Sequence, residues 1–143
     1  MIESTLPRAI ATAESLRGLL DGRVFLPGDP GYDAARTPWN VAVDQRPAAV
    51  AVPTSAEEVV LVVRAAADAG LRVVPQSTGH GAGPLTGRFD DAVLLRLSDF
   101  AGVTIDPERR VARPLGATLW QDVAEAAAAH GLAAMHGSSP DVA

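Results

Sequence analysis

The sequence contains no cysteine and no lysine, and aromatic residues make up only 4% of its 143 positions. The absence of cysteine excludes disulfides, thiolate catalysis and cysteine-based zinc sites. All twelve basic residues are therefore arginines, which are scattered along a chain with a formal net charge of −5. A nucleic-acid-binding protein would need a basic face, so we expect no nucleic-acid partner.

Long hydrophobic runs are also missing. No stretch approaches the ~20 consecutive apolar residues of a membrane span. Charged side chains interrupt the N-terminal segment, where a secretory signal would need an unbroken apolar run. We therefore expect a cytoplasmic protein with no membrane partner. An apolar share of 48% and a charged share of 20% are typical of a globular chain, and this length allows one domain with a buried core.

Sequence patterns divide the chain at about residue 46. Residues 1–45 are expected to form a lead-in, with a short helix over 10–20 and an irregular segment rich in glycine and proline over 27–46. Residues 46–143 carry the regular alternation of apolar strands and amphipathic helices that is typical of a folded domain.

A strand, a helix and a second strand are predicted in succession after Pro47. Residues 48–52 are apolar, and Thr54 with Glu57 has the spacing of a capping box at the start of a helix. The helix is expected to end at Gly70, and the apolar residues 71–74 follow as a strand. This order is that of a βαβ unit, which requires two parallel strands.

Four more elements are predicted further along the chain. Residues 92–97 form an apolar strand, and an Asp-Pro turn joins 103–105 to 111–113 in a hairpin. A second helix is expected over 119–129, with a capping box that begins at Thr118.

The most informative segment is the loop after the second of these strands. Gly79, Gly81 and Gly83 alternate around His80. A loop without side chains lets backbone N–H groups close on an anion such as a diphosphate. A neutral imidazole in the same loop could act as a nucleophile toward an electrophilic carbon of the bound cofactor. The pattern therefore suggests a nucleotide cofactor, and it is neither a Rossmann fingerprint nor a P-loop.

Simpler interpretations of these residues stay open. The glycine pattern fits a flexible surface turn equally well, and His80 could be an ordinary hydrogen-bonded loop histidine. His130 precedes a glycine at a predicted helix end, where the helix dipole favours a cation. His136 is expected to be structural, and the histidine spacing predicts no metal site. Trp39 and Trp120 are expected to be core anchors.

Short segments that match one protein family follow each other in order along the chain. They are residues 39–40, 46–50, 53–59, 69–71, 77–80, 131–133 and 137–142. Together they resemble the PCMH-type FAD-binding domain of the vanillyl-alcohol oxidase / p-cresol methylhydroxylase superfamily, and within it the berberine-bridge-enzyme-like oxidases. Each segment alone is weak, and their order makes the resemblance specific.

The resemblance implies an α+β fold with a βαβ unit and mixed sheets flanked by helices. It also implies that the chain is a truncated, N-terminal part of an FAD-linked oxidase, with the substrate domain and the catalytic base beyond Ala143. Such an enzyme takes hydride from a small alcohol, amine or sugar-like substrate onto FAD, with molecular oxygen as the expected acceptor. The alternative is a non-catalytic nucleotide- or FAD-binding module, or one half of a split protein.

The resemblance further implies which residues contact the cofactor. The family's loop usually reads Ser-Gly-Gly-His, and its histidine carries the flavin through the 8α-methyl group. That histidine corresponds to His80, while Thr78 replaces the first glycine. Some members add a second bond from a cysteine where this chain has Ser139, so a single tether is expected. The implied cofactor-binding residues are His80, Gln76, Ser77, Thr78, Gly79, Gly81, Ala82, Gly137, Ser138, Ser139 and Val142.

Overall fold

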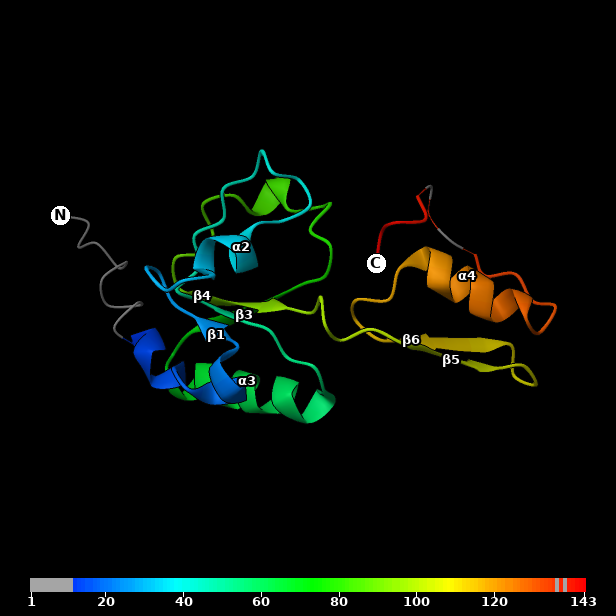
Figure 1. Cartoon of the computed structure of the whole chain (residues 1–143), viewed down its shortest axis with the longest axis horizontal. Helices are drawn as coiled ribbons and strands as arrows, with labels where there is room; N and C mark the ends of the chain where they lie inside the picture. Colours follow the sequence, from blue (N-terminus) through cyan, green and yellow to red (C-terminus); the bar gives the residue numbers. More distant parts are fainter. Residues whose placement is uncertain (1–11, 136, 138) are drawn as a thin grey trace.

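Two β-sheets lie side by side in the computed structural model, which describes residues 12–135, 137 and 139–143 (Figure 1). The four-stranded sheet has the order β1-β2-β4-β3 and the other is the hairpin β5-β6. The strands are β1 (Val24–Phe25), β2 (Ala49–Ala51), β3 (Arg72–Gln76), β4 (Ala92–Arg96), β5 (Val103–Asp106) and β6 (Val111–Pro114). The α+β class and the mixed sheet are confirmed, since β1 is antiparallel to β2 and the other pairs of the larger sheet are parallel.

The predicted βαβ unit is present, with one strand inserted into it. Helix α3 (Ala56–Asp68) connects β2 to β3, and both strands run parallel to β4, which lies between them. In the register, Leu94 pairs with Val50 on one side and with Val74 on the other. β2 and β4 read as continuous apolar runs because both of their faces are covered. The carboxyl ends of β3 and β4 therefore meet at one edge of the sheet.

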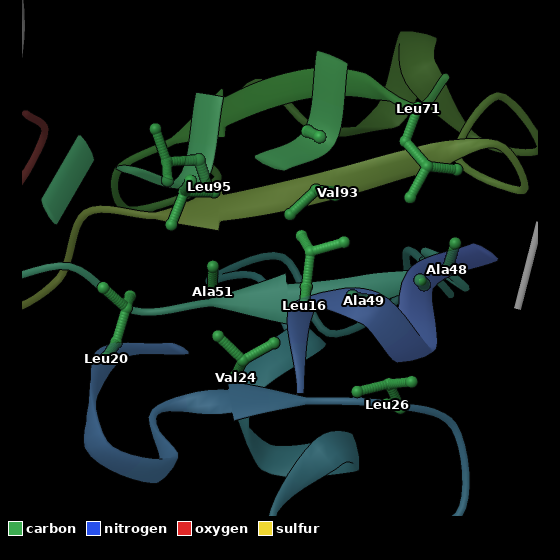
Figure 2. Close-up of a cluster of buried hydrophobic side chains, with 13 residues drawn as sticks. Leu16, Leu20, Val24, Leu26, Ala48, Ala49, Ala51, Leu71, Val93 and Leu95 are labelled. Carbon is green, nitrogen blue, oxygen red and sulfur yellow. The ribbon is translucent and has the colours of Figure 1, made fainter. Parts of the chain in front are cut away.

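Apolar side chains fill both faces of the larger sheet. On one face α3 contributes Val62 and Ala66 to a cluster that includes Leu16, Leu20, Val24 and Leu26 (Figure 2). On the other face Tyr32, from helix α2 (Tyr32–Arg36), packs with Val50, Phe89 and Leu94. Burying one leucine or phenylalanine side chain contributes about 1.5–3 kcal/mol, so these clusters fix the sheet between its helices.

The N-terminal segment differs from the expected helix over 10–20. Residues 1–11 lie outside the described part. Thr12 and Ala13 are α-helical, and after them come the 3-10 turns η1 (Glu14–Leu16) and η2 (Leu19–Gly22). Gly18, with φ of +87°, separates the two turns, because this conformation does not continue a right-handed helix. β1 and α2 are additional elements that the sequence patterns did not predict, and β1 joins the same sheet as β2.

The start of α3 is capped one residue later than predicted. Ser55 is the N-cap, and its hydroxyl accepts from the Glu58 amide at 3.2 Å. The Glu58 carboxylate accepts from the Thr54 amide at 2.7 Å and pairs with Arg23. Thr54 with Glu57 and Ser55 with Glu58 both have the Ser/Thr-x-x-Glu spacing. The capping interaction forms at Ser55 and Glu58, and Glu58 also pairs with Arg23.

Helix α4 (Trp120–Ala128) covers the β5-β6 hairpin (Figure 1). The predicted capping box at Thr118 does not form, because the Thr118 hydroxyl donates to the Gly102 carbonyl at 2.6 Å instead. The amides of Trp120 and Gln121 at the helix start donate to the carbonyls of Val142 and Pro140, at 2.9 and 3.0 Å. The last described residues are thereby bound to the N-terminus of α4.

The Glu58 contacts give the fold a testable dependence on pH. The bonds from Arg23 and then Thr54 lower the pKa of Glu58 from 4.5 to about 2. Because the folded-state pKa lies below the ordinary value, the ionised carboxylate stabilises the fold above pH 4.5, and this contribution is lost as the pH falls toward 2. Glu58→Gln should lower the melting temperature at pH 7, and the gap to the parent should close between pH 4.5 and 2.

The control for this prediction is Glu57→Gln. Glu57 is the exposed neighbour, and the described part of the chain gives it no ion pair. Thermal unfolding followed by circular dichroism compares the two variants with the parent across that pH range. Equal melting temperatures for all three proteins at pH 7 would show that the Arg23–Glu58 contact does not contribute to stability.

Candidate functional site

The glycine-rich loop begins at the sheet edge where β3 and β4 end. Gln76, the last residue of β3, is buried. Its backbone carbonyl accepts from the Leu97 amide at 2.9 Å, and its side-chain oxygen accepts from Arg96 Nη1 at 2.9 Å. Ala82 is also buried, and its amide donates to the Gly79 carbonyl at 3.2 Å. Both ends of the loop are thus anchored in the fold, so the loop is not a free surface turn.

Gly79 is the position where this loop requires glycine. Its φ is +84°, and a Cβ added there would lie 2.6 Å from Pro38 Cβ. Next to this contact, the Trp39 amide donates to the Thr78 carbonyl at 2.8 Å. Gly81 has no atom within 4 Å of such a Cβ and lies at the exposed side of the loop. The close approach between Pro38 and the loop therefore depends on one glycine of the alternating set.

His80 is held by three side chains from different segments. Its ring stacks on Trp39 with centroids 4.0 Å apart and planes 20° apart. Nδ1 lies 2.7 Å from Thr78 Oγ1, and Nε2 lies 3.8 Å from Asp141 Oδ2. The expectation that Trp39 is a core anchor was wrong, because its side chain is 60% exposed and serves as the platform for the imidazole.

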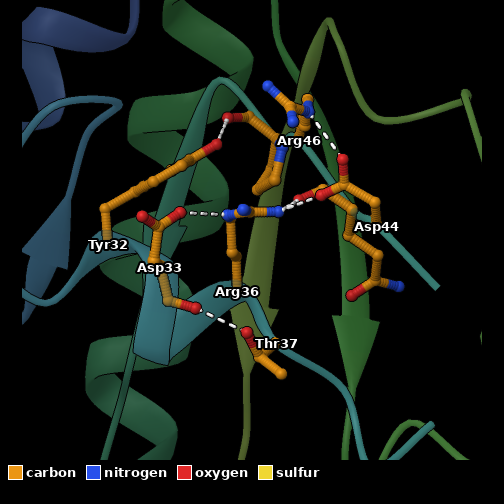
Figure 3. A network of polar contacts seen from close by, with 8 residues as sticks. Tyr32, Asp33, Arg36, Thr37, Asp44 and Arg46 are labelled. Carbon is orange, nitrogen blue, oxygen red and sulfur yellow. Dashed lines mark hydrogen bonds and ion pairs between the residues drawn. The ribbon is translucent and has the colours of Figure 1, made fainter. Parts of the chain in front are cut away.

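A network of ion pairs positions the segment that carries Trp39 (Figure 3). Arg36, at the end of α2, pairs with Asp33 and with Asp44. Tyr32 donates to the Pro47 carbonyl at 2.6 Å, and burial raises the pKa of Tyr32 to about 12, so it remains a donor at neutral pH. A cavity of about 170 Å³ lies beside these residues. The network fixes α2 on the sheet, and the chain passes directly from α2 to the loop contact.

The last described residues approach His80 from the opposite end of the chain. Ser139 donates a hydrogen bond to Asp141. This bond is the main cause that lowers the pKa of the Asp141 carboxyl, and a backbone hydrogen bond and then the nearby His80 lower it further. Asp141 is therefore ionised where it faces the imidazole. Gly137 is exposed. Ser138, another expected cofactor contact, lies outside the described residues, as does His136.

A cavity of about 400 Å³ opens beside the loop. This volume lies in the range of small-molecule sites, about 300–1,000 Å³. The lining residues come from the loop, the ends of β3 and β4, the segment after α2 and the segment before α4. They are Thr37, Pro38, Trp39, Ser77, Thr78, Arg96, Ser98, Ala117 and Leu119.

The lining brings together some of the expected site residues and adds new ones. Of the expected contacts, Ser77 and Thr78 line the cavity. The others in the described chain do not, namely Gln76, Gly79, His80, Gly81, Ala82, Gly137, Ser139 and Val142. The hydroxyl of Ser77 is buried and has no hydrogen-bond partner in the described part of the chain. Arg96 was not predicted, because a single arginine in an apolar strand carries no local signal of a site.

Metal and membrane sites find no support in the described residues. No group of three or more histidine and acidic side chains there could hold a metal ion. Among those residues no helix is long and apolar enough to span a lipid bilayer.

Comparison with known proteins identifies relatives along most of the chain. A family described as "FAD binding domain" matches residues 47–142. The chain is 34% identical over 123 residues to (R)-6-hydroxynicotine oxidase of Paenarthrobacter nicotinovorans, covering 86% of this chain and 27% of that protein. It is 31% identical over 113 residues to glucooligosaccharide oxidase of Sarocladium strictum, covering 78% and 23%. The chain thus spans about a quarter of the length of these curated relatives.

Solved structures agree with these matches. 6-hydroxy-D-nicotine oxidase from Arthrobacter nicotinovorans superposes with a TM-score of 0.69 at 35% identity, over 83% of this chain and 26% of the other. A BBE-like 1 variant from Physcomitrella patens superposes with a TM-score of 0.63 at 22% identity, over 86% and 25%, and supports the fold alone.

The two glycines of the loop provide a matched pair of substitutions. Gly79→Ala should destabilise the ligand-free protein, because a left-handed conformation costs a residue with a Cβ roughly 1–2 kcal/mol and the new methyl group would collide with Pro38. Gly81→Ala adds a methyl group in open space and should leave stability nearly unchanged. Urea unfolding followed by fluorescence measures both. Equal midpoints would show that the Pro38 contact does not restrict the loop.

Proposed function

The chain belongs to the PCMH-type FAD-binding domains of berberine-bridge-enzyme-like oxidases, and we propose that it holds FAD in the cavity beside His80. The observation that carries this proposal is the meeting of the glycine loop, the held imidazole and the 400 Å³ cavity at one sheet edge. In this proposal residues 46–143 supply the cofactor-binding unit, and the segment before them contributes Trp39 to it.

The residues around the cavity suit a flat ring that carries a charged tail. Pro38, Trp39, Ala117 and Leu119 offer apolar surface to a ring. The orphaned hydroxyl of Ser77 offers a hydrogen bond, and the backbone amides of the glycine loop can close on phosphate oxygens. Bound FAD supplies a two-electron acceptor for hydride from a small alcohol, amine or sugar-like substrate, with molecular oxygen as the final acceptor.

His80 is the residue that we propose as the covalent attachment point. The Thr78 hydroxyl lies 2.7 Å from Nδ1, so Nε2 would be the ring nitrogen that replaces one hydrogen of the 8α methyl. That hydrogen would leave as a proton, and the two electrons would pass into the flavin ring and from there to molecular oxygen. An imidazole that is substituted at one nitrogen and protonated at the other is cationic, and the ionised Asp141 beside Nε2 offsets that charge. Trp39 holds the ring plane in place. Ser139 cannot form the second bond that a cysteine would form.

A binding module without catalysis is the second candidate function. None of the described residues that line the cavity is a carboxylate or a histidine able to take a proton from a substrate. The two functions differ in one observation on the longer protein that the resemblance implies, because an oxidase would lose its visible flavin absorbance when reduced by substrate without oxygen. A module would keep that absorbance with every alcohol, amine and sugar tried.

The tether gives a direct prediction. After acid precipitation the protein pellet should stay yellow, and the tryptic peptide of residues 73–88 should carry the added mass of one FAD. His80→Ala should release all flavin into the supernatant, because the only proposed bond is lost. The control is His130→Ala, since His130 is exposed at the end of α4. Yellow pellets from His80→Ala, or an unmodified peptide from flavin-loaded parent protein, would contradict the tether.

A further inference from the structure

Arg96 differs from the ion-paired arginines of the described chain, because its contact is with a neutral group. Six other arginines of the described chain pair with carboxylates, namely Arg17, Arg23, Arg36, Arg46, Arg72 and Arg109. Those without an ion pair there are exposed to solvent, namely Arg64, Arg88, Arg110 and Arg113. Arg96, at the end of β4, is partly buried, and within the described chain its guanidinium donates to the neutral side-chain oxygen of Gln76 at 2.9 Å. Burial lowers the pKa of Arg96, and no carboxylate of the described chain counteracts this.

An unpaired cation at this position calls for an anion from outside the chain. Moving a charge out of water without a counter-ion costs free energy. The charge of Arg96 is partly removed from water at the wall of the 400 Å³ cavity. Ser77, Thr78 and Ser98 line the same cavity, and the Ser77 hydroxyl is buried without a partner in the described chain. A planar guanidinium among hydroxyl groups is the donor set that binds phosphate oxygens.

We propose that Arg96 is the side chain that binds the diphosphate of the cofactor, as the counter-charge to the phosphates gripped by the glycine loop. This inference rests on the proposed function. The phosphates are the anionic part of FAD in every redox state, whereas the oxidised flavin ring is neutral. Arg96 contacts Gln76 at the start of the loop. It lines one cavity together with Ser77 and Thr78, so a ligand there can be reached from both strand ends.

A structural role is the competing explanation of the Arg96–Gln76 bond. The two strand ends are already joined by the parallel pairing of Gln76 with Arg96 and by the Leu97 amide on the Gln76 carbonyl. The side-chain hydrogen bond is therefore not needed to hold the two strand ends together. Removing the cation should leave the ligand-free protein as stable as the parent or more stable, because an unpaired partly buried charge is removed.

The test measures binding of FAD, ADP and riboflavin to the protein in a His80→Ala background, where no tether can form. Arg96→Met should weaken FAD and ADP by about 10- to 100-fold, the range for losing a hydrogen bond to a charged group. Riboflavin has the ring without the diphosphate, so its affinity should change little. Arg96→Lys should recover part of the loss, and added salt should weaken FAD more in the parent than in Arg96→Met.

Arg64→Met is the matched control, because Arg64 is exposed on α3 and does not line the cavity. It should bind all three ligands as the parent does. Unchanged affinity for FAD and ADP in Arg96→Met would overturn the inference, as would an equal loss for riboflavin, or a lower melting temperature of the ligand-free variant. If the His80→Ala parent binds neither FAD nor ADP, the proposed function fails. If it binds both and Arg96→Met binds equally well, only the role of Arg96 fails.

Discussion

The close approach of Pro38 to Gly79 is the contact on which the site depends. A side chain at position 79 would occupy the space of Pro38 Cβ, and the neighbouring Trp39 amide could not then reach the Thr78 carbonyl. Without that bond the indole would have no fixed place against the His80 ring. One glycine thus sets the distance between two segments forty residues apart, and the platform under the imidazole and one wall of the cavity follow from that distance.

Arginine side chains have two different surroundings in this structure. Arginines paired with carboxylates fix segments that lack regular structure, as Arg36 does where it joins α2 to Asp44. Each exposed pair of this kind contributes little to the free energy of unfolding. The main effect of the Arg36–Asp44 pair is therefore to select one path for the chain between α2 and β2. Arg96 is the contrasting case, since it faces a cavity without an acidic partner among the described residues. In the proposed function a ligand would neutralise that charge, whereas Arg36 has its carboxylate partners within the chain.

Local patterns predicted those parts of the fold that local forces determine. The periodicity of α3 and α4 and the Asp-Pro turn of the hairpin are properties of short windows, and the structure has all three elements. The insertion of β4 between β2 and β3 depends on long-range pairing that no short window contains. The prediction that Trp39 is a core anchor failed for the same reason, because only the tertiary contact at Gly79 brings its ring to His80. The family resemblance indicated that the loop binds a cofactor. The glycine spacing alone fitted a flexible surface turn equally well.

The helix ends show why the loop and Arg96 would have to bind a diphosphate in this fold. The N-terminus of a helix is a ready anion site only if its first amides are free. At α4 the amides of Trp120 and Gln121 already donate to carbonyls of the last described residues. At α3 the hydroxyl of Ser55 caps the helix and the carboxylate of Glu58 adds negative charge beside it. The first amides of these helices, the two longest in the described chain, are thus already occupied or lie beside negative charge, and the proposed function therefore assigns the phosphates to the glycine loop and to Arg96.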